Sequence, residues 1–279
     1  GSPGAKAGLT TGDMIETIKG VATRDMPLAY ANLLLRGQPG SAIEMTVLRR
    51  KPEPQKMSLT RAAITYPAVI SKVLPNNIGY IQPETLANGK VKEVAAAVND
   101  LQKKGVRKFV LDLRNCAVGT PEDGVDLANL FMDKGLIAYL QGQRFPRKDF
   151  QADSKKAITN LPLIVITNRG TASGAEIAAA ALQNGKRSEI VGERTYGDAS
   201  VRQAVSMDDG GAVILSVAKY YSPDGKAIQD NGVTPGTLVA EPDSAVELDE
   251  EGNPVGKDEP DKKPTEDLLL KKALELLNK

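Results

Sequence analysis

The sequence predicts an α/β core with a mixed sheet, a small β module ahead of it and a helix after it. Strands and helices alternate through the middle of the chain, which is typical of α/β domains. Two runs, "VRKFVLDLRN" and "LPLIVIT", contain the continuous apolar stretches of strands that are covered on both faces of a sheet. The first 62 residues instead alternate apolar and polar side chains, as half-buried strands do.

Residues 1–62 form the expected β module, which includes one helix. The alternating segment "AGLTTGDMIETIKG" predicts a strand that turns at Lys19-Gly20. "MPLAYANLLLRG" predicts a helix over about 27–36, which Gly37 ends. "SAIEMTVLRR" and "QKMSLTRAA" predict two more strands, joined by a turn at "KPEP".

Residues 63–240 form the expected core. Gly105 ends the predicted helix "GKVKEVAAAVNDLQKKG", and Gly185 ends the small-residue helix "SGAEIAAAALQNG". We expect another helix at about 122–132 and an irregular stretch at 141–160. The predicted strands are "NIGYIQP", "VRKFVLDLRN", "LPLIVIT", "EIVGE", "AVILSVAKYYSP" and "GTLVAE".

The C-terminal part of the sequence divides in two. Residues 241–264 are acidic and rich in proline and glycine, which predicts a solvated linker or a disordered loop. Residues 265–279 include "TEDLLLKKALELL", which predicts an amphipathic helix with Thr265 as its N-cap.

Composition excludes several kinds of site. The absence of histidine rules out Ser-His-Asp and Cys-His catalysis and histidine-based zinc sites. The single cysteine, Cys116, rules out an internal disulfide and a multi-cysteine metal site, so we expect neither metal nor cofactor. A net charge of +1 gives no reason to expect nucleic acid or an anionic membrane as partner. The opening "GSPGAKAGL" is typical of the interior of a domain, which is compatible with a fragment of a longer precursor, so the absence of a visible signal peptide carries little weight.

The segment "NRGTASGAEI" predicts a serine nucleophile. Ser173 follows a buried strand and begins a helix, whose exposed N–H groups and positive dipole end favour a developing alkoxide. From this pattern alone, a purely structural role as an N-cap is the stronger alternative, because serine is a preferred cap residue. In a chain without histidine, the base for Ser173 would have to be Lys, Asp, Glu or Tyr.

Several motifs together resemble one family. "IGYI", "VLDLRN", "GTASGAEIAAAAL", "VGERTYG" and "AKYYSPDGKAIQDNGVTP" stand in the order found in carboxyl-terminal processing proteases, and "GSPGAKAGLTTGDMIETIKG" resembles the middle of a PDZ domain. The sequence thus resembles an S41-type serine peptidase, with a partial PDZ domain at 1–62 and an S41-like protease core at 63–240. The resemblance implies Ser173 as nucleophile and acyl-enzyme hydrolysis of polypeptides near apolar C-terminal tails. It also implies a location outside the cytoplasm, in the periplasm or cell envelope, and leaves self-association into a homo-oligomer open.

The sequence departs from the family at the position of the general base. The family carries a lysine in a T-F-G-K-G-x-V-Q segment, and the matching "TYGDASVRQ" has Asp198 at that position. Arg202 stands where the family has a glutamine that orients the lysine. A carboxylate is a much weaker base toward a hydroxyl than a desolvated neutral amine. We expect Asp198 and Arg202 to form an ion pair, and we favour a structural ion pair over a catalytic one.

The loop after "VLDLRN" is altered as well. The family has N-P-G-G there, with a glycine N–H in the oxyanion hole, whereas this sequence has Cys116-Ala117-Val118-Gly119. The oxyanion candidates are Val118, Gly119 and Gly174, and valine at the first glycine position predicts a strained or reoriented loop. Cys116 as a replacement nucleophile is a weaker interpretation than Cys116 as a small buried residue.

Two lysines remain as alternative bases. Lys186 follows the helix that Ser173 begins, so we expect it at the opposite end of that helix. Lys219 lies in the strand "AKYY", where the family usually carries a positive residue. Neither is a strong candidate.

The PDZ-like segment is also incomplete relative to the family. The carboxylate-binding loop of family PDZ domains precedes the segment with which this sequence begins. The helix near 27–36 would line one side of a peptide groove, but we do not expect residues 1–62 to capture a free C-terminus.

Three functions therefore stay open. The first is a peptidase with an unusual base. The second, which the changes at 198, 202 and 116–119 favour, is a pseudoprotease that binds peptides or proteins without cutting them. The third is a structural or regulatory subunit whose cleft is unused.

Overall fold

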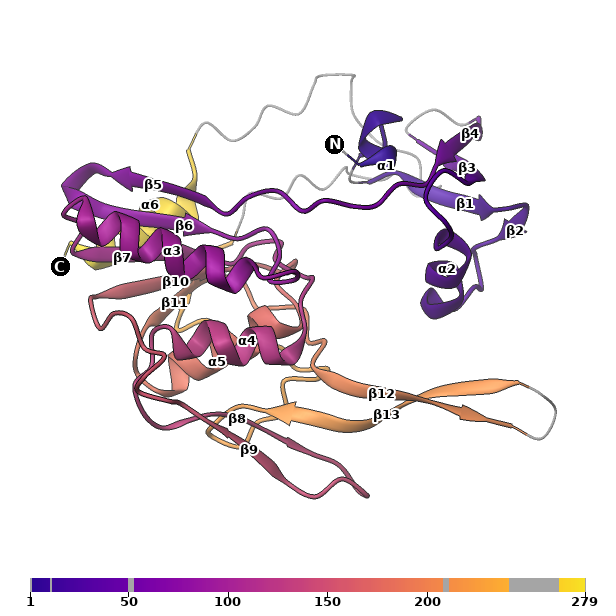
Figure 1. Ribbon diagram of the computed structural model, residues 1–279. Helices are drawn as coiled ribbons and strands as arrows, with labels where there is room; N and C mark the ends of the chain where they lie inside the picture. The colour runs from indigo at the N-terminus through magenta and orange to yellow at the C-terminus, as the bar shows by residue number, and fades with distance from the viewer. Residues whose placement is uncertain (1, 11, 50–52, 208–210, 241–265, 279) are drawn as a thin grey trace. The chain divides into compact units, whose positions relative to one another are not determined.

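The computed structural model describes residues 2–10, 12–49, 53–207, 211–240 and 266–278. The described chain forms two compact units, one that ends at Tyr66 and one that begins at Pro67. Each unit has its own hydrophobic core, and Figure 1 shows the elements of both.

The first unit is a four-stranded antiparallel sheet with two short helices. The strands lie in the order β2-β1-β3-β4. The predicted turn between β1 and β2 is confirmed, because Lys19 and Gly20 both have positive φ, at 51° and 78°, as a two-residue type I′ hairpin requires. The elements are α1 (Pro3–Lys6), β1 (Met14–Ile18), β2 (Val21–Ala22), α2 (Leu28–Leu35), β3 (Ala42–Leu48) and β4 (Gln55–Thr60).

The second unit contains a six-stranded and a four-stranded sheet. The larger has the order β14-β11-β10-β7-β6-β5, in which only the β5–β6 pair is antiparallel. The smaller sheet, β12-β13-β8-β9, is antiparallel throughout. The strands are β5 (Ile70–Leu74), β6 (Ile78–Gln82), β7 (Lys108–Asp112), β8 (Leu136–Gln141), β9 (Lys148–Gln151), β10 (Leu163–Thr167), β11 (Glu189–Gly192), β12 (Ser200–Ser206), β13 (Ala212–Tyr221) and β14 (Thr237–Leu238).

Helices cover both faces of the larger sheet, as Figure 1 shows for α3, α4 and α5 on one side and α6 on the other. Alternate residues of each central strand therefore enter different cores: in β10, Val165 packs with α5, whereas Ile164 and Ile166 pack with α6. The continuous apolar runs are explained by this double coverage. The helices of this unit are η1 (Pro75–Asn77), α3 (Lys90–Lys103), α4 (Pro121–Asn129), α5 (Gly174–Asn184) and α6 (Leu268–Leu277).

The predicted fold class, an α/β core with a mixed sheet, a β module and a C-terminal helix, is confirmed. The prediction of an irregular stretch at 141–160 is wrong in part, because β9 lies within it. The strands β5, β8 and β12 were likewise not predicted. β5 and β12 mix polar and apolar residues and lack the continuous apolar run that marks β7 and β10, whereas β8 (LIAYLQ) does carry such a run.

At the C-terminal end, Asp267 caps α6 by accepting a hydrogen bond from the N–H of Leu270 at 3.0 Å. The expected cap Thr265 and the expected linker at 241–264 lie outside the described residues. Arg114, at the end of β7, holds this cap through an ion pair with Asp267 at 2.7 Å.

Candidate active site

Ser173 stands at the tight connection between β10 and α5. It occupies the N-cap position of α5 with φ 58° and ψ −128°, a conformation that costs a residue with a Cβ roughly 1–3 kcal/mol. The preceding loop is fixed by Thr171, whose hydroxyl donates to the carbonyl of Leu113 at 2.8 Å. A strained serine on a strand–turn–helix connection is the geometry of an exposed nucleophile in several hydrolases.

The hydroxyl of Ser173 donates to the carbonyl oxygen of Gly119 at 2.9 Å. The loop that carries Gly119 is itself held, because the Val118 carbonyl accepts hydrogen bonds from the Leu86 N–H at 2.8 Å and the Thr85 hydroxyl at 2.9 Å. A side chain at position 119 would meet Leu86, because an added Cβ would lie 2.7 Å from the Leu86 Cβ. Glycine is therefore required beside the serine.

The oxyanion candidates surround this contact. Val118 is half exposed and does not have positive φ, so the strain expected from valine at this position is absent. The N–H groups of Gly119 and Gly174 make no hydrogen bond with any residue that the structure describes. Gly174 also allows α4 to approach closely, since a Cβ there would lie 2.3 Å from the carbonyl oxygen of Thr120. The site thus has free N–H donors near Ser173.

Glu176 joins the serine to the segment where the base is expected. Its carboxylate is fully buried and accepts hydrogen bonds from the N–H groups of Ser173 (3.1 Å), Gly197 (2.7 Å) and Asp198 (2.8 Å), and from the Thr195 hydroxyl. Burial raises the pKa of Glu176, while these hydrogen bonds act in the opposite direction. Sequence patterns assign no role to Glu176, because three of its four partners lie 19 to 22 residues further along the chain.

Asp198 and Arg202 form the ion pair that the sequence predicts, with Arg202 Nη2 at 2.5 Å from Asp198 Oδ1. Both side chains are partly exposed. Lys219 is engaged elsewhere, because its Nζ lies 2.9 Å from Asp230 Oδ2. The side chain of Gln229 and then Lys219 lower the pKa of Asp230. Lys186 follows the C-terminal end of α5, opposite Ser173, as expected.

Cys116 is fully buried, and burial raises the pKa of its thiol to about 12. A thiol with such a pKa is a poor nucleophile at neutral pH. The interpretation of Cys116 as a small buried residue is therefore the better supported one.

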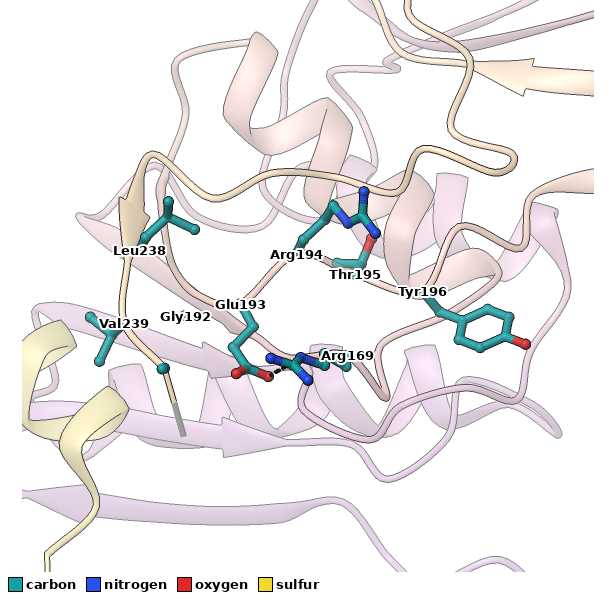
Figure 2. Close-up of a pocket in the computed structure, with 9 residues that line it drawn as sticks. Arg169, Gly192, Glu193, Arg194, Thr195, Tyr196, Leu238 and Val239 are labelled. Atoms are coloured by element: carbon teal, nitrogen blue, oxygen red, sulfur yellow. Dashed lines mark ion pairs between the residues drawn. The ribbon is translucent and has the colours of Figure 1, made fainter. Parts of the chain in front are cut away.

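A pocket of about 760 Å³ lies beside this site, at the carboxyl ends of β10 and β11 (Figure 2). It shares Thr195 and Tyr196 with the segment that Glu176 holds. Its other lining residues are Arg169, Gly192, Glu193, Arg194, Leu238, Val239 and Ala240.

The described ranges contain neither a metal-binding cluster of side chains nor a membrane-spanning helix. No group of three or more His, Cys, Asp or Glu side chains there is placed to hold a metal ion. None of the helices in those ranges combines the length and apolarity needed to cross a membrane.

Known proteins share both the sequence pattern and the fold. Residues 77–239 match the model of peptidase family S41, and residues 1–49 match a PDZ domain. The carboxyl-terminal-processing protease of Synechocystis sp. is 34% identical over 247 residues, which cover 87% of this chain and 58% of that protein. Carboxy-terminal processing protease CtpA of Bacillus subtilis is 35% identical over 246 residues, covering 88% of this chain and 53% of that protein.

A solved structure is similar to this chain at a comparable sequence identity. The photosystem II D1 C-terminal processing protease matches with a TM-score of 0.70 and 31% identity, over 90% of this chain and 69% of that chain. The chain spans about half the length of the curated relatives it matches. Because the family match covers more than half of the chain, the chain belongs to peptidase family S41, with a PDZ domain ahead of the peptidase core in the sequence.

Proposed function

We propose that this chain is a polypeptide-binding pseudoprotease: it keeps the cleft of an S41 peptidase and binds polypeptide there, but it lacks an efficient base for Ser173. The observation that carries the proposal is the ion pair between Asp198 and Arg202 at the position of the family's lysine. A carboxylate is a much weaker base toward a serine hydroxyl than a neutral amine, and the carboxylate at this position is engaged by a guanidinium at 2.5 Å.

The hydrogen bonding of the serine supports the same proposal. Attack by Ser173 needs an acceptor for its hydroxyl proton. Within the described part of the chain, that hydroxyl donates to the Gly119 carbonyl and to no side chain. A carbonyl oxygen is far too weak a base to take this proton. Lys219, the lysine of β13, is paired with Asp230.

A second function, an active endopeptidase that uses Asp198 as base, is favoured by a different observation. The strained backbone of Ser173 and the buried Glu176 carboxylate beside it are retained. Strain of this kind persists where the surroundings enforce it, often at functional sites. The third possibility, a subunit whose cleft is unused, predicts that no peptide binds.

The ligand we propose is a polypeptide with an apolar C-terminal tail, outside the cytoplasm, in the periplasm or cell envelope. Support comes from the family and from the relatives, which are named as carboxyl-terminal processing proteases and include bacterial and chloroplastic proteins.

Labelling with a fluorophosphonate probe separates the two main functions. The pseudoprotease proposal predicts no covalent labelling of the wild-type chain and none of Ser173→Ala. Labelling of the wild type that disappears in Ser173→Ala would overturn the proposal and support the active endopeptidase.

Introducing the family's lysine and glutamine at positions 198 and 202 tests whether the general base is the group that the site lacks. In Asp198→Lys with Arg202→Gln, an amine replaces the carboxylate and a neutral amide replaces its guanidinium partner. We expect this double variant to cleave casein while the wild type does not, with Ser173→Ala in the same background as the control. If the double variant stays inactive, the missing base is not the sole cause of inactivity, and the 116–119 loop is implicated.

A further inference from the structure

The pocket in Figure 2 has rigid walls made by main-chain hydrogen bonds. The N–H of Glu193 donates to the Thr167 carbonyl at 3.0 Å, and the N–H of Tyr196 donates to the Thr171 carbonyl at 2.9 Å. On the other side, the N–H of Val239 donates to the Gly192 carbonyl at 3.0 Å. The crevice outside the carboxyl ends of parallel strands is where open α/β sheets commonly bind ligands.

The pocket carries more positive than negative charge. Arg169 contacts Glu193 only loosely, at 3.5 Å, and its side chain is 78% exposed. Arg194 is exposed and forms no ion pair with any described residue. Arg194 also lines a neighbouring pocket, together with Lys186 and Lys226. Because Asp224 and Glu193 are the acidic residues that line these two pockets, four cations face two anions there.

Two exposed apolar side chains border the same pocket. Tyr196 is 70% exposed and Leu238 is 69% exposed, the highest values among the large apolar side chains described in the second unit. Figure 2 shows Leu238 at the left and Tyr196 at the right of the pocket, with Arg194 drawn between them in this view. A guanidinium with no ion-pair partner among the described residues, in a pocket bordered by two exposed apolar side chains, is complementary to a ligand that carries a carboxylate next to apolar groups.

We propose that this pocket binds the C-terminal carboxylate of a polypeptide. Arg194 pairs with the carboxylate, with Arg169 as the second cation, and the apolar side chains of the preceding residues pack against Tyr196 and Leu238. The chain terminus fits better than an internal acidic side chain, because a terminus places its charge directly beside its last apolar side chain.

The inference deepens the proposed function and rests on it in one respect, namely that the ligand is a polypeptide. Thr195 and Tyr196 belong both to the pocket and to the segment that Glu176 ties to Ser173. A polypeptide end held in the pocket would therefore contact the segment that Glu176 ties to Ser173.

The test measures binding of three fluorescein-labelled ten-residue peptides to the full chain carrying Ser173→Ala, by fluorescence polarisation. All three end in the sequence Ala-Leu-Val. One has a free carboxylate, one has a C-terminal amide, and one has the amide together with an internal glutamate. We expect the free acid to bind about tenfold or more tightly than either amide, because a charge-assisted pair is lost with the terminal charge.

Substitutions of pocket residues test whether the preference for the free acid arises in this pocket. Arg194→Ala should weaken binding of the free acid by about tenfold and leave binding of the amide unchanged, because only the free acid carries the charge that pairs with Arg194. Tyr196→Ala should weaken both, because it removes the apolar wall. Lys155→Ala, which removes an exposed cation outside the pocket, is the matched control and should change neither. Thermal unfolding of each variant checks that the chain folds.

Several outcomes would overturn the inference: equal binding of acid and amide, equal binding of the peptide with internal glutamate, or unaltered binding by Arg194→Ala. None of these outcomes changes the result of fluorophosphonate labelling at Ser173. The carboxylate-binding inference and the pseudoprotease proposal can therefore be rejected independently of each other.

Discussion

The two sides of the candidate site are built in different ways. The serine side, made of Gly119, Ser173 and Glu176, consists of a strained residue, a glycine that no other residue can replace without a clash, and a fully buried carboxylate. The base side, made of Asp198, Arg202, Lys219 and Asp230, consists of ion pairs between partly exposed side chains.

The difference teaches which part of an active site can change without loss of the fold. The serine side is continuous with the core through α5, a helix whose residues from Gly174 to Leu182 are all buried. Substitutions there disturb packing and buried hydrogen bonds, which are costly to lose. Exposed ion pairs contribute little to folding, so residues on the base side can change at small cost to stability.

Gly124→Ala should have the largest effect. An added Cβ at Gly124 would lie 2.0 Å from the carbonyl oxygen of Gly174, so α4 and α5 would have to separate where the serine side begins. We expect the free energy of unfolding to fall by about 3 kcal/mol, although alanine is the better helix former. Urea unfolding measures this change. Glu122→Ala, on the exposed side of the same helix, is the control and should change stability by less than ~0.5 kcal/mol.

Glu176→Gln should come next. All four partners of Glu176 are donors, so either orientation of a glutamine amide would point its NH2 group at N–H or O–H groups. We expect a loss of about 2–3 kcal/mol, because a buried donor is left facing another donor. Chemical denaturation measures the loss, with Glu122→Gln as the exposed control. Equal stability of the two variants would show that the serine side is not held by this carboxylate.

Much of the serine side could be predicted from the sequence. The long-range hydrogen bonds that hold the serine side in place could not. The buried strand β10, the helix from Ser173 and the ion pair of Asp198 with Arg202 all follow from local patterns and short spacings. Glu176 could not be assigned, because a glutamate three residues after a serine is also a common capping pattern. Its long-range partners are brought close only when the segment from Thr195 to Asp198 folds back on α5. The strand β12 has no apolar run to predict it, since most of its length is exposed.

Ser173→Gly should stabilise the protein relative to Ser173→Ala. Both variants lose the hydroxyl that donates to Gly119, but only glycine adopts φ 58° and ψ −128° without a steric penalty. After the larger backbone entropy of glycine in the unfolded chain is subtracted, we expect a difference of about 1 kcal/mol. Thermal unfolding of the two variants measures it. If alanine is as stable as glycine, the backbone of residue 173 is not strained.

The two sides should also respond to pH in opposite directions. Burial raises the pKa of Glu176, so its contribution to stability is present at acid pH and is lost as pH rises through the raised pKa. Gln229 and Lys219 lower the pKa of Asp230, so its contribution is present above the ordinary range of aspartate and is lost as pH falls through the lowered pKa. Unfolding of wild type, Glu176→Gln and Asp230→Asn between pH 3 and 8 tests both signs. The same sign for both variants would contradict the contrast.

The smallest effect should come from the ion pair of Asp198 with Arg202. Its two side chains are 33% and 49% exposed, so solvent screens their attraction. A double-mutant cycle with Asp198→Ala, Arg202→Ala and the double variant should give a coupling energy of about 0.5 kcal/mol or less, falling further in 0.5 M salt. A coupling above ~1.5 kcal/mol that resists salt would instead indicate a desolvated, preorganised pair. The carboxylate would then be held in place as firmly as the serine. The choice between pseudoprotease and peptidase would depend on whether Asp198 can release Arg202 when a polypeptide binds.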